Sequence, residues 1–325
     1  MLVDETLAQE IESAAVQMAR GAGEILAGHF GRQMRVEYKD KAQRDPVTDA
    51  DKTCQEFLSK EITRKFPSHA ILGEETTDDE TKAKENTGKA SDDEVETPSS
   101  DFLWVLDPLD GTTNFLNGLP VYASSIGVLY QGWPVAAALY IPWPNPNGGF
   151  VLHCHKGGGC FADDEPVSVY ESDEPGSNRL IGLPGSFMQT ARFTGKLRSN
   201  AGEMRTTGSI AYELAMTARG VLQYAVIGAP RIWDMAAGAL AVMEAQGTVM
   251  TRFRGEKQWH QLESLVPTWE TILPTMKELR NWMAPLVAGN RQVAPMIAGN
   301  IRPRFRPLAK LRHLSRRLRP RKRQA

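Results

Sequence analysis

Residues 102–115 read FLWVLDPLDGTTNF, and the fold prediction starts from this stretch. Five apolar residues predict a buried strand, and Asp107 comes directly at its carboxyl end. A proline fixes the backbone of the turn that follows, and Gly111 permits a tight entry into a helix that two threonines begin. The segment therefore predicts a strand–turn–helix unit that holds Asp107 and Asp110 beside the free amides of a helix N-terminus.

This pairing of groups has a chemical meaning. Carboxylate oxygens bind hard divalent cations, and the N-terminus of a helix binds phosphate. A site that offers both is suited to metal-assisted phosphate-ester chemistry. An ordinary helix with Asp110 as its N-cap explains the same residues, so both interpretations stay open on this segment alone.

Further acidic residues lie at the ends of predicted elements. Glu74 follows a short apolar strand, Asp234 opens an apolar helix, and Asp49 and Asp51 open another helix. Each of them alone is more typical of a helix cap or of a surface acid. If they converge in the fold, their mutual repulsion requires cations between them.

The predicted elements indicate an α/β (α+β) layered sandwich. Short strands follow one another directly between residues 123 and 155, which favours antiparallel or mixed sheets, and the helices interleave without a strict βαβ repeat. Helices are expected at 7–30, 47–66, 209–219 and 233–246, and strands at 70–73, 102–106, 123–130, 135–141 and 150–155.

The composition permits a large core and excludes a chain that is disordered throughout. Of the 325 residues, 41% are hydrophobic, yet no run approaches the length of a membrane-spanning helix. The N-terminal residues lack the basic and apolar regions of a signal peptide. Three sparse cysteines do not form a disulfide framework. We therefore expect a cytoplasmic protein.

Residues 76–100 are nearly free of apolar side chains and predict a solvated, flexible acidic loop.

Five segments in one order resemble the inositol monophosphatase family of magnesium-dependent, lithium-sensitive phosphatases. The resemblance runs from about Leu7 to about Gly289 and leaves out the acidic loop and the C-terminal tail. It implies a layered αβαβα sandwich of the sugar-phosphatase type over residues 1–300, and a homodimer as the usual state. The segments are DPVTDAD at 45–51, ILGEE at 71–75, WVLDPLDGTTNF at 104–115, GS at 208–209 and WDMAAG at 233–238.

The resemblance also implies a metal centre with two to three Mg²⁺ ions. Glu74, Asp107 and the carbonyl oxygen of Leu109 would hold the first ion. Asp107, Asp110 and Asp234 would hold the second. A third, weaker ion would use Glu74.

Catalytic roles follow from the same resemblance. Thr112, with Asp51 behind it, would orient and help to deprotonate the attacking water on the first metal, which Glu74 helps to hold. The backbone amides of Gly111 and Thr112 would take the oxygens of the substrate phosphate. No covalent phosphoenzyme is needed.

The expected function is Mg²⁺-dependent hydrolysis of a small phosphomonoester, such as an inositol phosphate, a sugar phosphate or histidinol phosphate. The inositol-specific members have an acidic residue seven positions before the tryptophan–aspartate motif, where this chain has Ile227. Two alternatives stay open: a 3′-phosphonucleotide phosphatase, and a catalytically inactive binding or scaffold protein on the same fold. The intact set of acids, together with Thr112, argues against an inactive copy.

Two weaker motifs favour structural roles. ASSIG at 123–127 loosely resembles a serine nucleophile elbow, but the residues that follow predict more strand instead of the helix that an elbow requires. His153 and His155 with Cys154 and Cys160 could suggest zinc. On a strand, however, Cys154 points away from the two histidines, so structural histidines and buried thiols are favoured.

The tail, residues 301–325, differs in charge from the rest. From Arg302 onward it carries eleven of the 38 Lys and Arg residues and no acid, so that residues 1–301 carry a net charge of −12. Four leucines at spacings of three, three and four predict a basic amphipathic helix suited to an anionic membrane surface or an acidic partner. A disordered tail, or one that folds back on the acidic body, explains the same residues. The charge of the body argues against specific nucleic-acid binding.

Overall fold

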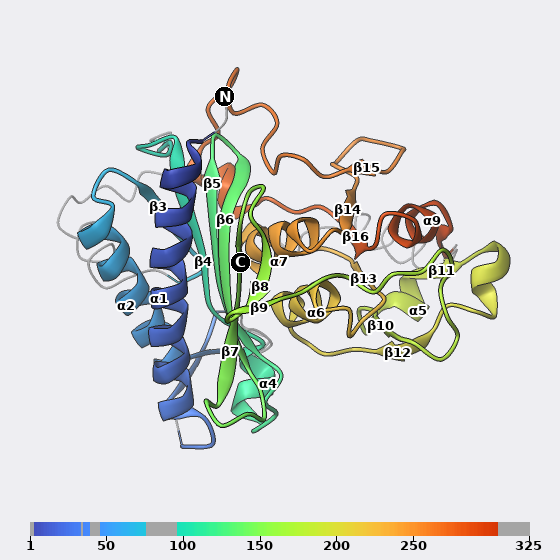
Figure 1. Ribbon diagram of the computed structural model, residues 1–325, viewed down its shortest axis with the longest axis horizontal. Helices are drawn as coiled ribbons and strands as arrows, with labels where there is room; N and C mark the ends of the chain where they lie inside the picture. The colour runs from blue at the N-terminus through green and yellow to red at the C-terminus, as the bar shows by residue number, and fades with distance from the viewer. Residues whose placement is uncertain (1–2, 34, 40–45, 76–95, 305–325) are drawn as a thin grey trace, which may run out of the picture.

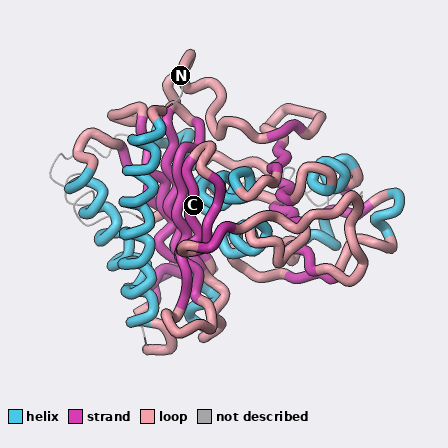
Figure 2. The backbone as a smooth tube through the Cα atoms, viewed as in Figure 1, coloured by secondary structure: helices cyan, strands magenta, loops and turns pink. Residues whose placement is uncertain are grey.

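The computed structural model describes residues 3–33, 35–39, 46–75 and 96–304. Within them, helices and sheets alternate in five layers (Figures 1 and 2). Helices α1 and α2 cover one face of a large sheet, α6 and α7 lie between this sheet and a second one, and α5 and α9 lie beyond the second sheet. This arrangement confirms the predicted αβαβα sandwich.

The larger sheet has seven strands in the order β3-β4-β5-β6-β7-β8-β9. Only its first pair, β3 with β4, is parallel, and every later pair is antiparallel, as the direct succession of short strands predicts. Its strands are β3 (Ala70–Gly73), β4 (Phe102–Asp110), β5 (Ala123–Tyr130), β6 (Trp133–Pro142), β7 (Gly149–His155), β8 (Gly159–Ala162) and β9 (Glu165–Pro166).

The second sheet is mixed and has the order β12-β10-β13-β16-β14-β15. Two further pairs, β1 with β2 and β11 with β17, stand apart from both sheets. The strands of the second sheet are β10 (Leu180–Gly182), β12 (Glu203–Arg205), β13 (Tyr224–Ile227), β14 (Thr248–Thr251), β15 (His260–Gln261) and β16 (Leu286–Gly289); the separate strands are β1 (Val36–Tyr38), β2 (Pro46–Thr48), β11 (Ala191–Phe193) and β17 (Ile301–Pro303).

The four predicted helices are all present, with ends that differ by a few residues from the prediction. In α2, Thr48 is the N-cap: its side chain accepts from the amides of Ala50 and Asp51, and the Asp51 carboxylate accepts from the Thr48 amide in return. The helices are α1 (Glu5–His29), α2 (Asp49–Lys65), α4 (Thr112–Leu116), α5 (Phe187–Thr190), α6 (Ile210–Ala218), α7 (Ile232–Glu244), α8 (Met276–Arg280) and α9 (Val293–Gly299), with a 3₁₀ turn at Gly195–Arg198.

Three clusters of buried side chains fill the spaces between the layers. Strand β4 supplies two of them, because its side chains alternate between the faces of the sheet. Trp104 and Leu106 pack under α1 and α2, whereas Leu103 and Val105 pack toward α6 and α7. A third cluster lies between the second sheet and α9. The strand that leads to Asp107 is therefore buried on both faces, which fixes the position of its carboxyl end.

Two expectations concern segments that are only partly described. Residues 76–95 of the acidic loop and 305–325 of the tail lie outside the described residues. At the described end of the loop, the carbonyl of Glu96 accepts from the Met276 amide of α8. Among the helices that the structure describes, none combines the length and the hydropathy that crossing a membrane would require.

Candidate active site

The turn after β4 is built as the sequence predicts, although β4 itself runs on to Asp110. The pairing of β4 with β5 shifts register between Asp107 and Asp110, and the Leu109 amide donates to Oδ1 of Asp107 over 3.1 Å. Gly111 has φ +93°, and a Cβ there would lie 3.0 Å from Ser209 Cβ. Glycine is therefore required at the entry to α4 both by conformation and by space.

Asp110 does not cap the helix that follows it, which corrects the simpler of the two interpretations of this segment. The N-cap of α4 is Gly111, which makes no side-chain cap. Instead, Oδ2 of Asp110 accepts from Ser209 Oγ over 2.7 Å and from the Ala211 amide at the start of α6. Ser209 belongs to the GS segment but has no predicted role. It orients Asp110 and also caps α6 through the Tyr212 amide.

Asp51 and Thr112 meet across the interface between α2 and α4. Thr112 Oγ1 lies 3.2 Å from Oδ1 of Asp51 and 3.0 Å from the Leu109 carbonyl. The other oxygen of Asp51 accepts from the Thr48 amide and hydroxyl. Burial raises the pKa of Asp51 to about 6, although the Thr48 hydrogen bonds oppose this.

Glu74 and Asp107 follow the last paired residues, Gly73 and Leu106, of the parallel strands β3 and β4. The Glu74 amide donates to the Leu106 carbonyl, and the Glu74 side chain lies close enough to Asp107 to raise the pKa of that carboxyl group. Burial raises the pKa of Asp107 well above its usual value, and the charges of Glu74, Asp110 and Asp234 raise it further. Carboxyl groups this close together require either a proton or a cation to offset their repulsion.

Asp234 reaches the same place from the first turn of α7. Its Oδ2 accepts from the Arg231 amide over 2.8 Å. Burial raises its pKa well above the usual value, and the nearby Asp110 and Glu74 add to this effect. For Asp110, burial raises the pKa to about 7. The structure thus brings together the four acids that the sequence predicts as metal ligands.

A cation already lies against this group. Lys39, beyond β1, places its Nζ 2.8 Å from Glu74 Oε1 and 2.5 Å from Glu75 Oε1. Burial would lower the pKa of Lys39, but the two glutamates raise it above its usual value. Nothing in the sequence around residue 39 indicates this contact, because Lys39 belongs to a short polar segment without periodicity.

The donor set fits a hard divalent cation in its chemistry. All the predicted ligands are oxygens, four of them belong to carboxylates whose charges repel one another, and one ammonium is attracted to them. As the side chains stand, no three described His, Cys, Asp or Glu residues are arranged around a single ion. Asp110 and Asp234 each direct Oδ2 to a backbone amide, which leaves Oδ1 of each as the oxygen for an ion.

A family model for the inositol monophosphatase family matches residues 7–290. The chain belongs to the inositol monophosphatase family. It is 28% identical over 251 residues to a fructose-1,6-bisphosphatase/inositol-1-monophosphatase of Aquifex aeolicus, which covers 75% of this chain and 86% of that protein. It is 33% identical over 241 residues to the Nus factor SuhB of Escherichia coli, covering 72% and 82%.

A solved structure shares the fold. The extragenic suppressor protein SuhB of Bartonella henselae superposes with a TM-score of 0.61 at 24% identity, over 87% of this chain and 95% of that one. As a member of the inositol monophosphatase family, the chain is a phosphoric monoester hydrolase.

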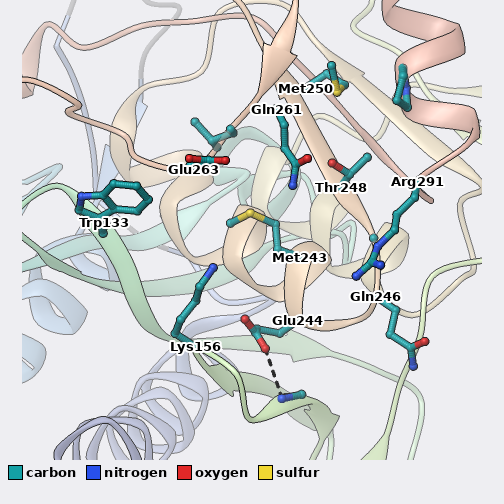
Figure 3. Close-up of a pocket in the computed structure, with 14 residues that line it drawn as sticks. Trp133, Lys156, Met243, Glu244, Gln246, Thr248, Met250, Gln261, Glu263 and Arg291 are labelled. Carbon is teal, nitrogen blue, oxygen red and sulfur yellow. Dashed lines mark hydrogen bonds between the residues drawn. The ribbon is translucent and has the colours of Figure 1, made fainter. Parts of the chain in front are cut away.

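A cavity of about 780 Å³ opens at the other end of α7 (Figure 3). Basic and acidic side chains line it together, among them Lys156, Arg291, Glu244 and Glu263, and Glu244 accepts from the Gly159 amide. None of the predicted site residues lines this cavity. Helix α7 thus has Asp234 in its first turn and a separate, charge-balanced opening beside its last.

The remaining candidates have structural roles. Ile227 is 3% exposed within the core between the sheets. Ser125 lies inside the continuous strand β5, so the segment is not a nucleophile elbow. Cys154 and Cys160 are buried free thiols, and His153 and His155 both contact Glu12. Asn114, which sequence reasoning missed, joins α4 to the loop before α6 through the carbonyl of Thr207.

Proposed function

We propose that this chain hydrolyses a small phosphomonoester in a Mg²⁺-dependent reaction. The observation that carries the proposal is the convergence of Glu74, Asp107, Asp110 and Asp234, which lie close enough for their charges to raise the pKa values of Asp107 and Asp234. Four neighbouring carboxyl groups, of which Asp107 is fully buried and the others are partly buried, cost stability unless cations neutralise them. Beside this group lies the N-terminus of α4, where amides are free of helical partners.

The proposed ligand sets are those that the family resemblance implies. Glu74, Asp107 and the Leu109 carbonyl would hold one Mg²⁺, Asp107, Asp110 and Asp234 a second, and Glu74 would support a third. When bound, Mg²⁺ supplies a water of lowered pKa and stabilises developing negative charge. Lithium inhibition is expected with these sites. Lys39 would then leave Glu74 or share it with the ion, since both compete for the same oxygen.

The side chains of the chain itself position the reactants. Asp51 accepts from the Thr112 hydroxyl, so Thr112 can receive a proton from a bound water while its own proton passes to Asp51. The amides of Gly111 and Thr112 would take phosphate oxygens. Asp110 is held in place by Ser209. Nothing in this scheme requires a covalent phosphoenzyme.

The substrate is a small phosphorylated metabolite: an inositol phosphate, a sugar phosphate or histidinol phosphate. The bifunctional name of the Aquifex relative supports a choice between inositol and sugar phosphates. Because Ile227 is buried in the core, it offers no polar contact to inositol hydroxyls. The test is phosphate release from a panel of these compounds and 3′-phosphonucleotides with Mg²⁺, with and without lithium.

The result of this panel separates the proposal from its alternatives. Preferred turnover of a 3′-phosphonucleotide would replace the substrate assignment. If Mg²⁺ binds but no compound is turned over, the result would favour a binding or scaffold protein. The relative from Escherichia coli, which is named a Nus factor, is the reason to keep this alternative.

Three further proposals concern the setting of the enzyme. A homodimer is expected from the family and is tested by light scattering after size-exclusion chromatography. A cytoplasmic location agrees with three cysteines that are all free thiols. The basic tail, with eleven Lys and Arg from Arg302 onward, is proposed to bind an anionic membrane surface or an acidic partner.

A further inference from the structure

One carboxylate and two imidazoles join helix α1 to strand β7. Nδ1 of His153 lies 2.6 Å from one oxygen of Glu12, and Nδ1 of His155 lies 2.6 Å from the other. The exposed fraction of the three side chains is 13% for Glu12, 19% for His153 and 11% for His155. The two histidines lie two residues apart on the strand, so both point to the face that α1 covers.

The hydrogen bonds of His153 determine how many protons this group contains. Its Nε2 lies 2.8 Å from the backbone carbonyl of Asp163, which can only accept, so Nε2 carries a proton. Its Nδ1 lies 2.6 Å from a carboxylate oxygen, and this short contact needs a second proton between the two atoms. A neutral imidazole supplies only one of these protons. His153 and Glu12 therefore share one proton more than a neutral histidine and a carboxylate contain.

His155 needs no additional proton. Its neutral form, with the hydrogen on Nδ1, donates to the second oxygen of Glu12. The group of three then has one negative charge, on Glu12, and one positive charge, on His153. These charges compensate each other inside a nearly buried contact.

We propose that Glu12, His153 and His155 form a proton-binding clasp that fastens α1 to the large sheet and opens when His153 loses its extra proton. Without that proton, Nδ1 of His153 and Oε1 of Glu12 face each other with lone pairs, and their contact becomes repulsive. The hold of β7 on α1 then rests on His155, on the pair of Arg20 with Asp163 and on apolar packing.

The charged groups around the clasp support the extra proton. Asp163, in the turn between β8 and β9, lies beside His153, and its carboxylate pairs with Arg20 of α1 over 2.9 Å and accepts from the Val151 amide. Burial alone would lower the pKa of His153, but Glu12 and the Asp163 carbonyl raise it above 6.5. Burial would raise the pKa of Glu12, yet the hydrogen bonds from both histidines lower it.

The signs of these shifts define a pH window. The raised pKa of His153 gives stability that is complete below about pH 6.5 and is lost as pH rises through the folded-state value. The lowered pKa of Glu12 gives stability that is complete above about pH 4.5 and is lost as pH falls. The clasp is therefore strongest between these limits and weakens on the alkaline side.

A metal ion does not explain the same geometry. Separations of 2.6 Å between nitrogen and oxygen are those of hydrogen bonds, and two ligands of one tetrahedral zinc lie farther apart, at about 3.3 Å for bonds near 2 Å. No group of described His, Cys, Asp and Glu residues is arranged to hold an ion. The bound species is a proton.

The test is a pH titration of the histidine ring nitrogens in the full chain by NMR, with His153 assigned by the loss of its signals in His153→Gln. We expect His153 to have both ring nitrogens protonated above pH 6.5, and Glu12→Gln to move its titration to lower pH. A His153 that titrates below pH 6.5 in the wild-type chain overturns the proposal, and so does an unchanged midpoint in Glu12→Gln. If Glu12→Gln does not fold, the wild-type titration decides alone.

Thermal unfolding provides the second readout and a matched control. The wild-type chain should lose thermal stability between pH 6 and pH 9, and Glu12→Gln should make that loss smaller. The remaining loss comes from the acids of the site, such as Asp110, whose raised pKa has the same sign of effect. His260 pairs with Glu256 at 2.8 Å on the exposed surface, so Glu256→Gln should leave the pH dependence unchanged. Equal effects of the two glutamine variants would contradict a specific clasp.

Discussion

Thr112 Oγ1 lies 3.2 Å from Oδ1 of Asp51, although the two residues are 61 positions apart in the chain. This contact joins the start of α4 to the start of α2. We predict that Thr112→Ala lowers kcat by about 10²- to 10⁴-fold, the usual contribution of a positioned proton acceptor, and leaves Mg²⁺ affinity nearly unchanged. Thr112→Ser keeps the hydroxyl and should retain much more activity. Equal loss in both variants would point to packing of the threonine methyl instead.

Ser209 should affect the metal centre without being a ligand. Ser209→Ala removes a 2.7 Å hydrogen bond to Asp110 and the side-chain cap of α6. We expect a loss of about 1 kcal/mol in the free energy of unfolding, and weaker Mg²⁺ binding measured by calorimetry. Thr275→Ala removes the cap of α8 and makes no contact with Asp110, so it should lower stability alone. Unchanged Mg²⁺ affinity in Ser209→Ala would show that Asp110 does not depend on Ser209.

Alanine substitutions at two glycines of α1 should change the free energy of unfolding in opposite directions. A Cβ at Gly23 would lie 2.3 Å from the Tyr140 ring, whereas a Cβ at Gly28 meets nothing within 4 Å. Gly23→Ala should therefore lower the free energy of unfolding by about 1–3 kcal/mol through overpacking. Gly28→Ala should raise it by about 0.5–1 kcal/mol, because alanine loses less backbone freedom on folding. Chemical denaturation measures both, and a stable Gly23→Ala would mean that α1 can shift on the sheet.

The tail is predicted to be separable from catalysis. Deleting residues 305–325 removes nine of the eleven basic residues from Arg302 onward and keeps β17, whose strand pairs with β11. Turnover of a soluble substrate should stay within about twofold, and flotation with vesicles that contain anionic lipid should be lost. Each basic residue near such a surface contributes about 1 kcal/mol, and salt screens this attraction. Equal flotation of both forms, or of neither, would contradict a membrane role.

Much of this fold could be predicted because its strong elements have long, clear patterns. The helices α1 and α7 and the strand β5 lie where periodicity places them. Most strands of the second sheet, such as β10 with three residues and β15 with two, are too short to show a period. They form because the neighbouring strands and helices complete their pairing and burial.

The site divides in the same way. Acids at element ends can be recognised from the sequence, and the fold brings Glu74, Asp107, Asp110 and Asp234 together. The contacts that orient them could not be recognised. Lys39 on Glu74 and Ser209 on Asp110 join residues 35 and 99 positions apart, through side chains that have no local signature.

Asp107 tests the central claim most directly, because its carboxylate is the proposed ligand of two ions and its pKa is raised by the charges of Glu74, Asp110 and Asp234. The measurement is phosphate release by wild type and Asp107→Asn on the best substrate of the panel, with Mg²⁺ and with excess chelator, alongside a thermal melt to show that the variant is folded. We predict that turnover disappears both in the folded variant and in chelated wild type. Turnover close to that of wild type in folded Asp107→Asn, or undiminished turnover in chelator, would contradict the metal-dependent site described for this chain.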